Sequence, residues 1–384
     1  MTPTRRQFVT TALAAATTAS LVRPTAAQAL DVDKLVARLN ELGIKLNGKD
    51  ATAEAVNAVQ AMGVSPAGAK LMDADVAMIA RMPKLGSLDL ANAAQLTPTA
   101  MAEIAKSPTI WNLTLTFTTI GDAGVAALIP TAKLSNLGLD GVKGITSASG
   151  AHLAAMKSLQ QVTLNSTEMN DDGLKALSGH PTLSLLYLSA MKTITDVGVG
   201  ALGSLPNLQS LTLDQTGIDG SCFKALAAAK KLHSLSLMRT KITDTTAQDL
   251  AGLTALKSLF IWNTMITDKA LGAIGKITAL QTMYLDRTGI TDDGIKQLSG
   301  LANLSSLWLS GTAVGDGCVA HLPSEKLSGL MMNETKLTDA GLLKLAAFPK
   351  LTSISARKTG VTDDGIKAAI AARPAGAPAL RISK

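Results

Sequence analysis

A single apolar pattern, Leu-x-x-Leu-x-Leu, dominates the chain from residue 85 onward and returns every 23 to 25 residues. In Leu-x-Leu, two side chains point to one face of the backbone and the middle residue points to the other, which predicts a short β-strand in each repeat. Twelve such strands are predicted, with no gap between repeats. The pattern begins at Leu85, Ile110, Leu134, Leu159, Leu183, Leu208, Leu232, Leu256, Leu280, Leu304, Leu327 and Leu351.

The segment between two strands carries a helical pattern. In the repeat that begins at residue 280 it reads Ile290-Thr-Asp-Asp-Gly-Ile-Lys-Gln-Leu298. Thr or Asp at the start, followed by apolar residues at three- and four-residue spacing, predicts a capped amphipathic helix that returns the chain to the next strand. Strands therefore line one side of the fold and helices line the other.

One repeat cannot be stable alone. Its three or four buried Leu-class side chains contribute about 1.5–3 kcal/mol each, whereas ordering ~24 residues costs about 1–2 kcal/mol per residue. The repeats must therefore be stabilised by stacking on one another. With neighbouring strands ~4.8 Å apart, the twelve repeats predict a concave sheet about 53 Å long.

Over residues 85–366 the pattern resembles the leucine-rich-repeat family, with Thr in place of the usual Asn after the strand. The Thr version is similar to the bacterial and the F-box-associated, cysteine-containing subtypes. The resemblance implies an α/β solenoid, a horseshoe with a parallel concave sheet and convex helices in about 12 repeats.

Both ends of the solenoid are expected to be capped, because terminal repeats are atypical. Residues 30–84 predict a helical N-terminal cap with Leu35, Leu39 and Leu42 on one face and no clear strand, although residues 39–44 could form a degenerate one. Residues 367–384 predict a C-terminal cap and tail, in which two prolines stop the helix and the last few residues are mobile.

Residues 1–29 predict a signal peptide. Arg5-Arg6 precede a weakly apolar stretch, residues 10–22, and then Ala27-Gln28-Ala29, a small-x-small cleavage site. This resembles a twin-arginine export signal, and an ordinary secretory signal is the alternative. Either signal implies a periplasmic or secreted protein. The apolar stretch falls short of the ~20 residues that span a bilayer, and no later segment qualifies, so we expect no membrane span.

The amino-acid composition and the net charge limit the kinds of partner that this protein is expected to bind. Apolar residues make up 47% of the chain and charged residues 17%, which excludes disorder, while aromatic residues are only 3%. The net charge of +7 includes three arginines and no carboxylate in residues 1–29, so 33 cations against 29 anions leave +4 for the rest. This excess is spread along the chain and favours no nucleic-acid partner.

Polar residues that recur with the repeat are expected to be structural. In nine repeats a Thr three residues past the strand can satisfy backbone groups where the chain turns, and the Asp at the helix start is expected to cap the helix and interact with its dipole. The threonines are Thr118, Thr167, Thr216, Thr240, Thr264, Thr288, Thr312, Thr335 and Thr359. The aspartates are Asp122, Asp171, Asp196, Asp219, Asp244, Asp268, Asp292, Asp316, Asp339 and Asp363.

The sequence predicts no enzyme, no metal site and no cofactor. Cys222 and Cys318 lie four repeats apart, about 19 Å, whereas a disulfide needs Cα atoms within about 7 Å. Motifs such as a nucleophile elbow, a phosphate loop or His-Glu-x-x-His are missing from the sequence. The histidines fall in different repeats, are expected at the surface and have no ligand spacing: His152, His180, His233 and His321.

The middle residue of Leu-x-Leu must point onto the concave face. Most repeats have a small or polar residue there, but three consecutive repeats have Phe260, Tyr284 and Trp308, and Tyr187 lies three repeats earlier. The chain contains only ten aromatic residues, five Phe, three Trp and two Tyr. We therefore predict a contact patch with an apolar centre and a polar border, as in protein interfaces. Its other residues are Trp262, Arg239, Arg287, Asp286, Asn263 and Asn333.

The predicted function is a monomeric, non-catalytic scaffold that binds a protein or a peptide, with a glycan as a further option. In the alternative interpretation the aromatic row only stabilises the sheet, at ~0.2–1 kcal/mol per cross-strand pair. A structural envelope protein would instead associate with itself. The resemblance to the F-box-associated subtype also implies an F-box-like adaptor. This function is disfavoured because residues 30–84 contain no clear F-box.

Overall fold

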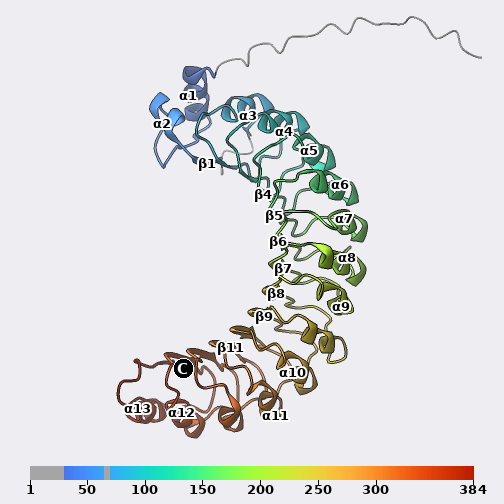
Figure 1. Cartoon of the computed structure of the whole chain (residues 1–384). Helices are drawn as coiled ribbons and strands as arrows, with labels where there is room; N and C mark the ends of the chain where they lie inside the picture. Colours follow the sequence, from blue (N-terminus) through green and yellow to red (C-terminus); the bar gives the residue numbers. More distant parts are fainter. Residues whose placement is uncertain (1–29, 65–69) are drawn as a thin grey trace, which may run out of the picture.

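A computed structural model describes residues 30–64 and 70–384, and the predicted signal peptide lies outside these residues. The chain forms a curved solenoid, with one parallel sheet on its concave side and helices on its convex side (Figure 1). The sheet has 14 strands in the described chain, and their spatial order is their order in the sequence. The predicted α/β solenoid is confirmed.

Each strand has three residues, and in all but the last strand of the sheet the middle residue is buried. In the predicted repeats this residue is Leu, Ile, Val or Met, and it lies opposite the same position of the next strand, as Leu88 does to Leu113. The twelve predicted strands are β2 (Ser87–Asp89), β3 (Asn112–Thr114), β4 (Asn136–Gly138), β5 (Gln161–Thr163), β6 (Leu185–Tyr187), β7 (Ser210–Thr212), β8 (Ser234–Ser236), β9 (Ser258–Phe260), β10 (Thr282–Tyr284), β11 (Ser306–Trp308), β12 (Gly329–Met331) and β13 (Ser353–Ser355).

The convex side carries short helices, as predicted. The α-helices are α1 (Val32–Glu41), α2 (Ala53–Ala58), α3 (Asp73–Ile79), α4 (Pro98–Ala105), α5 (Gly121–Ala127), α6 (Ser147–Ala155), α7 (Asp171–Ala176), α8 (Asp196–Ala201), α9 (Phe223–Leu226), α10 (Asp268–Ile274), α11 (Asp292–Ile295), α12 (Asp339–Leu345) and α13 (Asp363–Ala371). The 3₁₀ helices are η2 (Leu202–Ser204), η3 (Thr246–Gly252), η4 (Lys296–Leu298) and η5 (Asp316–His321).

In two repeats a 3₁₀ helix replaces the predicted α-helix. These segments are η3 and η5. The repeat that contains η5 is the shortest, with 23 residues between Leu304 and Leu327. A 3₁₀ helix rises ~2.0 Å per residue instead of ~1.5 Å, so it covers the same distance with fewer residues.

The N-terminal cap differs from its prediction in one respect. Helix α1 buries Leu35 and Leu39 as expected, and the guanidinium of Arg38 holds the carboxylate of Asp75 with two hydrogen bonds of 2.9 and 3.1 Å. The cap also contributes a strand, β1 (Ala61–Gly63), which pairs with β2. The expectation of no clear strand was wrong because Val59, Met62 and Val64 occupy the three buried positions of the repeat pattern without a leucine among them. The possible strand at 39–44 is wrong too, since its first half is helical.

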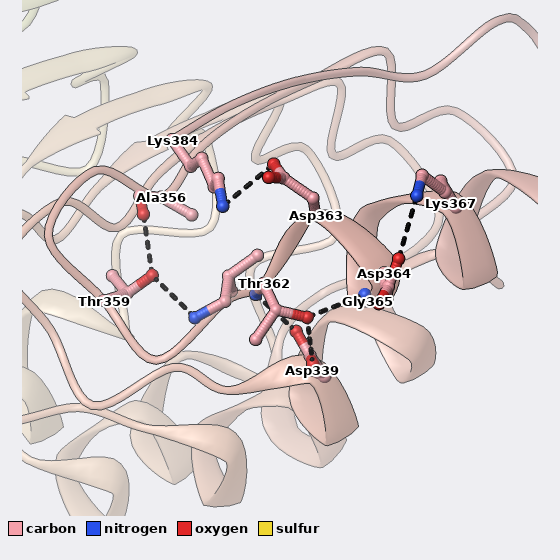
Figure 2. Close-up of polar contacts among 10 residues, drawn as sticks. Asp339, Ala356, Thr359, Thr362, Asp363, Asp364, Gly365, Lys367 and Lys384 are labelled. Atoms are coloured by element: carbon pink, nitrogen blue, oxygen red, sulfur yellow. Dashed lines mark hydrogen bonds and ion pairs between the residues drawn. The ribbon is translucent and has the colours of Figure 1, made fainter.

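The C-terminal tail is not loose. Helix α13 ends before the two prolines, as expected, but β14 (Arg381–Ser383) then pairs with β13. Arg373 ties this segment to the last repeat, because its guanidinium donates to four backbone carbonyl oxygens at 2.8–2.9 Å. Lys384 forms an ion pair of 2.8 Å with Asp363 (Figure 2). These contacts overturn the expected mobility of the last residues.

Nine repeats carry the predicted threonine in the turn after the strand, and in eight of them its hydroxyl donates to a backbone carbonyl oxygen of that turn, as predicted. The hydroxyl of Thr240 donates to the carbonyl oxygen of Leu237 at 2.6 Å, and Thr359 makes the same bond to Ala356 (Figure 2). Thr118 is an exception, because its buried hydroxyl has no partner within the described residues. The residue before each threonine has a left-handed backbone, as in Arg287 with φ of 51°. This conformation is uncommon outside glycine and directs the side chain away from the strand.

The recurring aspartates join neighbouring repeats. Asp339 accepts hydrogen bonds from the amide of Thr362, at 2.8 Å, and from its hydroxyl, at 2.7 Å (Figure 2). Thr362 is itself the N-cap of α13, where its hydroxyl accepts from the amide of Gly365. The expected capping role of the aspartates was therefore wrong in detail. Thr caps its own helix, and Asp, one residue later, holds the cap of the next repeat.

Within residues 30–64 and 70–384, no helix combines the length and the apolar character needed to cross a membrane.

Replacing Asp122 by Ala should destabilise the fold. Its carboxylate accepts hydrogen bonds from the amide and hydroxyl of Thr146 and from the amide and hydroxyl of Ser149 in the next repeat. Loss of this acceptor should lower the free energy of unfolding in urea by about 2 kcal/mol at pH 7. Asp172→Ala is the matched control, because the Asp172 side chain contacts only Lys175. A loss in the control as large as that in Asp122→Ala would contradict the prediction.

The loss should also depend on pH. Burial raises the pKa of the Asp122 carboxyl, but the hydrogen bonds from Ser149 and Thr146 together outweigh burial and hold that pKa below its ordinary value. A lowered pKa gives stability that is present above the ordinary value and is lost as pH falls through the folded value. The difference between wild type and Asp122→Ala should therefore shrink as unfolding is measured below about pH 4.

Candidate binding site

The predicted aromatic row forms on the concave face. Phe260, Tyr284 and Trp308 end three consecutive strands and lie opposite one another in register. The Phe260 and Tyr284 rings meet edge to face, with centroids 4.7 Å apart, and the Tyr284 and Trp308 rings stack at 3.8 Å with 10° between their planes. All three side chains are partly exposed. The row is thus a continuous apolar ridge on an otherwise polar sheet.

A second layer of side chains lies where the chain leaves these strands. Trp262 follows β9, and the guanidinium carbon of Arg239 lies 4.9 Å from the centroid of the Trp262 ring. A cation over an indole face at this distance is attracted by the ring quadrupole. The indole N–H of Trp262 points at the sulfur of Met238. Met238 and Arg239, which belong to the turn of the preceding repeat, therefore hold the indole in place.

A cavity of about 510 Å³ lies between the aromatic row and this second layer. Six predicted residues line it: Arg239, Trp262, Tyr284, Asp286, Arg287 and Trp308. Asn333, predicted for the border, lines it as well. The residues that sequence reasoning missed are Met238, Ser310, Gly311, Met331 and Glu334. The repeat pattern could have indicated them, because each occupies the same position in its repeat as a predicted residue one or two repeats away.

Three predicted residues lie outside the cavity. Phe260 touches it only through the Tyr284 ring, and Asn263 does not line it. Tyr187 ends β6, which is three strands from β9, or roughly 14 Å at ~4.8 Å per strand. The structure therefore does not bring Tyr187 together with the other predicted residues.

The aliphatic part of the Arg287 side chain packs against the next repeat, whereas its guanidinium makes no bond in the described chain. Its backbone is left-handed, and a Cβ atom built on Gly311 would lie 3.1 Å from the Cγ atom of Arg287. The stem therefore lies along the glycine of the next repeat. Within the described chain, no hydrogen bond or ion pair involves the guanidinium of Arg287.

The two carboxylates that line the cavity, those of Asp286 and Glu334, are already bonded to other residues of the protein. Asp286 accepts a hydrogen bond of 2.6 Å from the amide of Ser310, and burial raises the pKa of its carboxyl. Burial, with the nearby charge of Asp286, also raises the pKa of the Tyr284 phenol. Glu334 forms an ion pair of 2.9 Å with Lys358, which lowers the pKa of Glu334.

No protein-family model matches the chain, and no curated protein is similar to it in sequence. Solved structures are similar in fold. An internalin from Listeria monocytogenes has a TM-score of 0.56 at 18% identity, and the match covers 92% of this chain and 94% of the internalin. A leucine-rich-repeat protein of Leptospira interrogans has a TM-score of 0.48 at 17% identity, with 87% and 98% covered. A plant peptide hormone receptor has a TM-score of 0.46 at 17% identity, and the match covers 74% of this chain and 46% of the receptor.

The chain has the leucine-rich-repeat fold. It combines the continuous parallel sheet with one strand and one convex helical segment in each repeat, and the Listeria internalin is similar to it in fold. At this level of identity the likeness concerns the fold, so the function must be argued from the cavity.

The cysteines and histidines of the solenoid form no second site. Both thiols are free and buried, and burial raises the pKa of each, that of Cys318 to about 12. His180 is buried, contrary to its expected surface position, because its ring nitrogens bond the carbonyl of Met156 at 3.2 Å and the amide of Leu183 at 3.2 Å. In the described part of the chain no three potential metal ligands come together.

A row of acids and amides along the leucine-rich repeats explains part of the predicted polar border. Asp214 accepts hydrogen bonds from the hydroxyl of Ser236, at 2.6 Å, and from the amide of Met238, at 2.9 Å. Asn333 makes the same two contacts, at 2.7 Å to Ser355 and 2.8 Å to the amide of Arg357. Asp286 therefore belongs to a structural row as well as to the cavity.

Asp214→Asn should leave stability unchanged or raise it at pH 7. Burial raises the pKa of the Asp214 carboxyl, whereas an amide in this position keeps both hydrogen bonds without a charge, as Asn333 does. A raised pKa means that stability is present below the ordinary pKa and is lost as pH rises through the folded value. Any advantage of Asn should therefore shrink when unfolding in urea is measured below about pH 4.

Asp214→Ala is the control for this prediction, because it removes the acceptor of both bonds. It should lower the free energy of unfolding by about 1–3 kcal/mol. Equal losses in the Asn and Ala variants would show that the negative charge, and not the acceptor, matters at this position.

Proposed function

We propose that this leucine-rich-repeat protein is a non-enzymatic scaffold that binds a protein or peptide segment in the concave cavity between β8 and β12. The observation that carries the proposal is the aromatic row beside that cavity. Four of the chain's ten aromatic residues, Phe260, Trp262, Tyr284 and Trp308, gather in three consecutive repeats. Aromatic and arginine side chains around a partly apolar hollow are the usual centre of a protein interface.

The sheet does not need these rings. The neighbouring strands β7 and β8 have Thr212 and Ser236 at the same position, and they pair in the same register as β9 to β11. Stabilisation of the sheet therefore does not explain why bulky rings occupy three adjacent positions. A partner that covers them would explain it, because it would remove their partly exposed apolar surface from water.

A peptide fits the cavity better than a glycan does. A sugar ring packs flat on an open aromatic face, but the Tyr284 ring has Trp308 on one side and Phe260 on the other, and Arg239 covers one face of Trp262. The cavity also offers the methionines Met238 and Met331. Methionine adapts its shape and suits the varied side chains of a protein partner.

We infer that the protein acts outside the cytoplasm, because residues 1–29 have the pattern of an export signal, with twin arginines and a small-x-small cleavage site. An F-box-like adaptor is not supported, because β1 of the N-terminal cap pairs with β2 and continues the sheet. Self-association through the same cavity would be visible as a dimer of residues 30–384 in solution, and this dimer would be lost when the aromatic row is removed.

The test is a selection of binding peptides. Random nonamer peptides are selected on residues 30–384, and their affinity is then measured for the triple variant Phe260→Ser, Tyr284→Ser, Trp308→Ser. We expect binding to weaken at least about thirtyfold, because central aromatic residues of an interface typically contribute 2 kcal/mol or more. Tyr187→Ser is the matched control, since Tyr187 has the same strand position outside the cavity.

Undiminished affinity in a triple variant that remains folded by circular dichroism would sink the proposal. So would an equal loss in Tyr187→Ser.

A further inference from the structure

Among the charged groups around the cavity, only the guanidinium of Arg287 has no hydrogen bond, ion pair or ring contact in the described chain. Arg239 lies over the Trp262 ring, and Lys358 is paired with Glu334 at 2.9 Å. The carboxylate of Asp286 accepts the amide of Ser310 at 2.6 Å. Neither Asp286 nor Glu334 forms an ion pair with Arg287, although its charge acts on both. The cavity therefore presents one open guanidinium.

The position of this guanidinium is set by the fold. A left-handed turn carries the side chain, with φ of 51° at Arg287, and the missing Cβ of Gly311 gives its stem a place to lie. A side chain held in this way loses less freedom when it binds. A guanidinium has five donors in a planar fork, which matches the two oxygens of a carboxylate.

We infer that Arg287 binds a carboxylate side chain of the partner, next to an apolar side chain that sits on Tyr284 and Trp308. The inference rests on the proposed function, and it names the chemistry of the peptide: Asp or Glu within about three residues of a large apolar residue. The spacing follows from the cavity, because Arg287, Tyr284 and Trp308 line one hollow of about 510 Å³ and three residues of an extended peptide, at ~3.3–3.6 Å per residue, span a hollow of this size.

The chain offers its own control for the substitution. Gln215 occupies the same turn position as Arg287 three repeats earlier, and it has the same left-handed backbone, with φ of 57°. Arg287→Gln therefore removes the charge and leaves a residue that this turn accommodates elsewhere. Arg239→Gln is the matched variant for a second exposed arginine of the cavity, whose guanidinium lies over Trp262.

The experiment uses the nonamer peptides that bind residues 30–384 and depend on the aromatic row. We expect them to be enriched in Asp or Glu within three residues of Phe, Trp, Leu or Met. For such a peptide, changing its acid to the amide should weaken binding to wild type and to Arg239→Gln about tenfold or more, the size of a charged hydrogen-bonded pair. The same change should have no effect on Arg287→Gln. High salt should weaken binding to wild type more than to Arg287→Gln.

Two results separate the possible failures. If row-dependent peptides are recovered but show no acid enrichment, or lose equal affinity on wild type and Arg287→Gln, the inference about Arg287 is wrong and the proposed function stands. If no row-dependent peptide is recovered, and a glycan array gives row-dependent binding of neutral sugars instead, both the inference and the peptide-binding function are wrong.

Discussion

The structure depends on one interaction, the in-register pairing of three-residue strands between neighbouring repeats. A strand this short has no stability alone, but Leu259 lies opposite Leu235 on one side and Met283 on the other, with its side chain in a continuous buried column. Each repeat is stable only as part of the stack. The same register places like positions side by side on the concave face. A change of residue type in adjacent repeats therefore creates a row, and the aromatic row of this chain is one.

Side-chain hydrogen bonds reinforce the stack on its convex side, and they change just before the cavity. Most repeats are joined by a carboxylate that holds the next Thr, as Asp244 holds Thr267 at 2.6–2.7 Å. Asp219 instead accepts the amide of Ser221 in its own repeat, and the link to the next repeat is made by the hydroxyl of Thr246. Helix α9 has only four residues here, and η3 follows as a 3₁₀ helix. At this point the link from a carboxylate to the next Thr is replaced by a hydroxyl bond to a backbone oxygen.

The sequence predicts features that recur with the repeat and misses those that occur once. The strands, the turn threonines and the aromatic row follow from periodicity alone. Strand β14 is one of the features that occur once, because Ile382 is followed two residues later by Lys384 and not by a leucine. The link from Asp339 to Thr362 does recur in other repeats, but a repeated pattern does not show that two residues 23 positions apart are bonded. Periodicity also cannot distinguish Arg287, which lines the cavity, from Asn263, which does not, because both occupy the same turn position.

The cavity itself arises from side-chain size within a regular backbone. The two turn residues that follow each strand differ in size from repeat to repeat. Met238-Arg239 and the indole of Trp262 are bulky and border the cavity toward the N-terminus, and Asn333-Glu334 border it toward the C-terminus. Between them the repeat of β11 has Ser310-Gly311, the smallest pair of the series, beneath which Trp308 closes the floor. The backbone hydrogen bonds continue unbroken through this repeat, since the amides of Arg287 and Gly311 both bond the following repeat at 2.8 Å. Two small residues therefore leave a hollow in the concave surface without disturbing the stacking that holds the solenoid together.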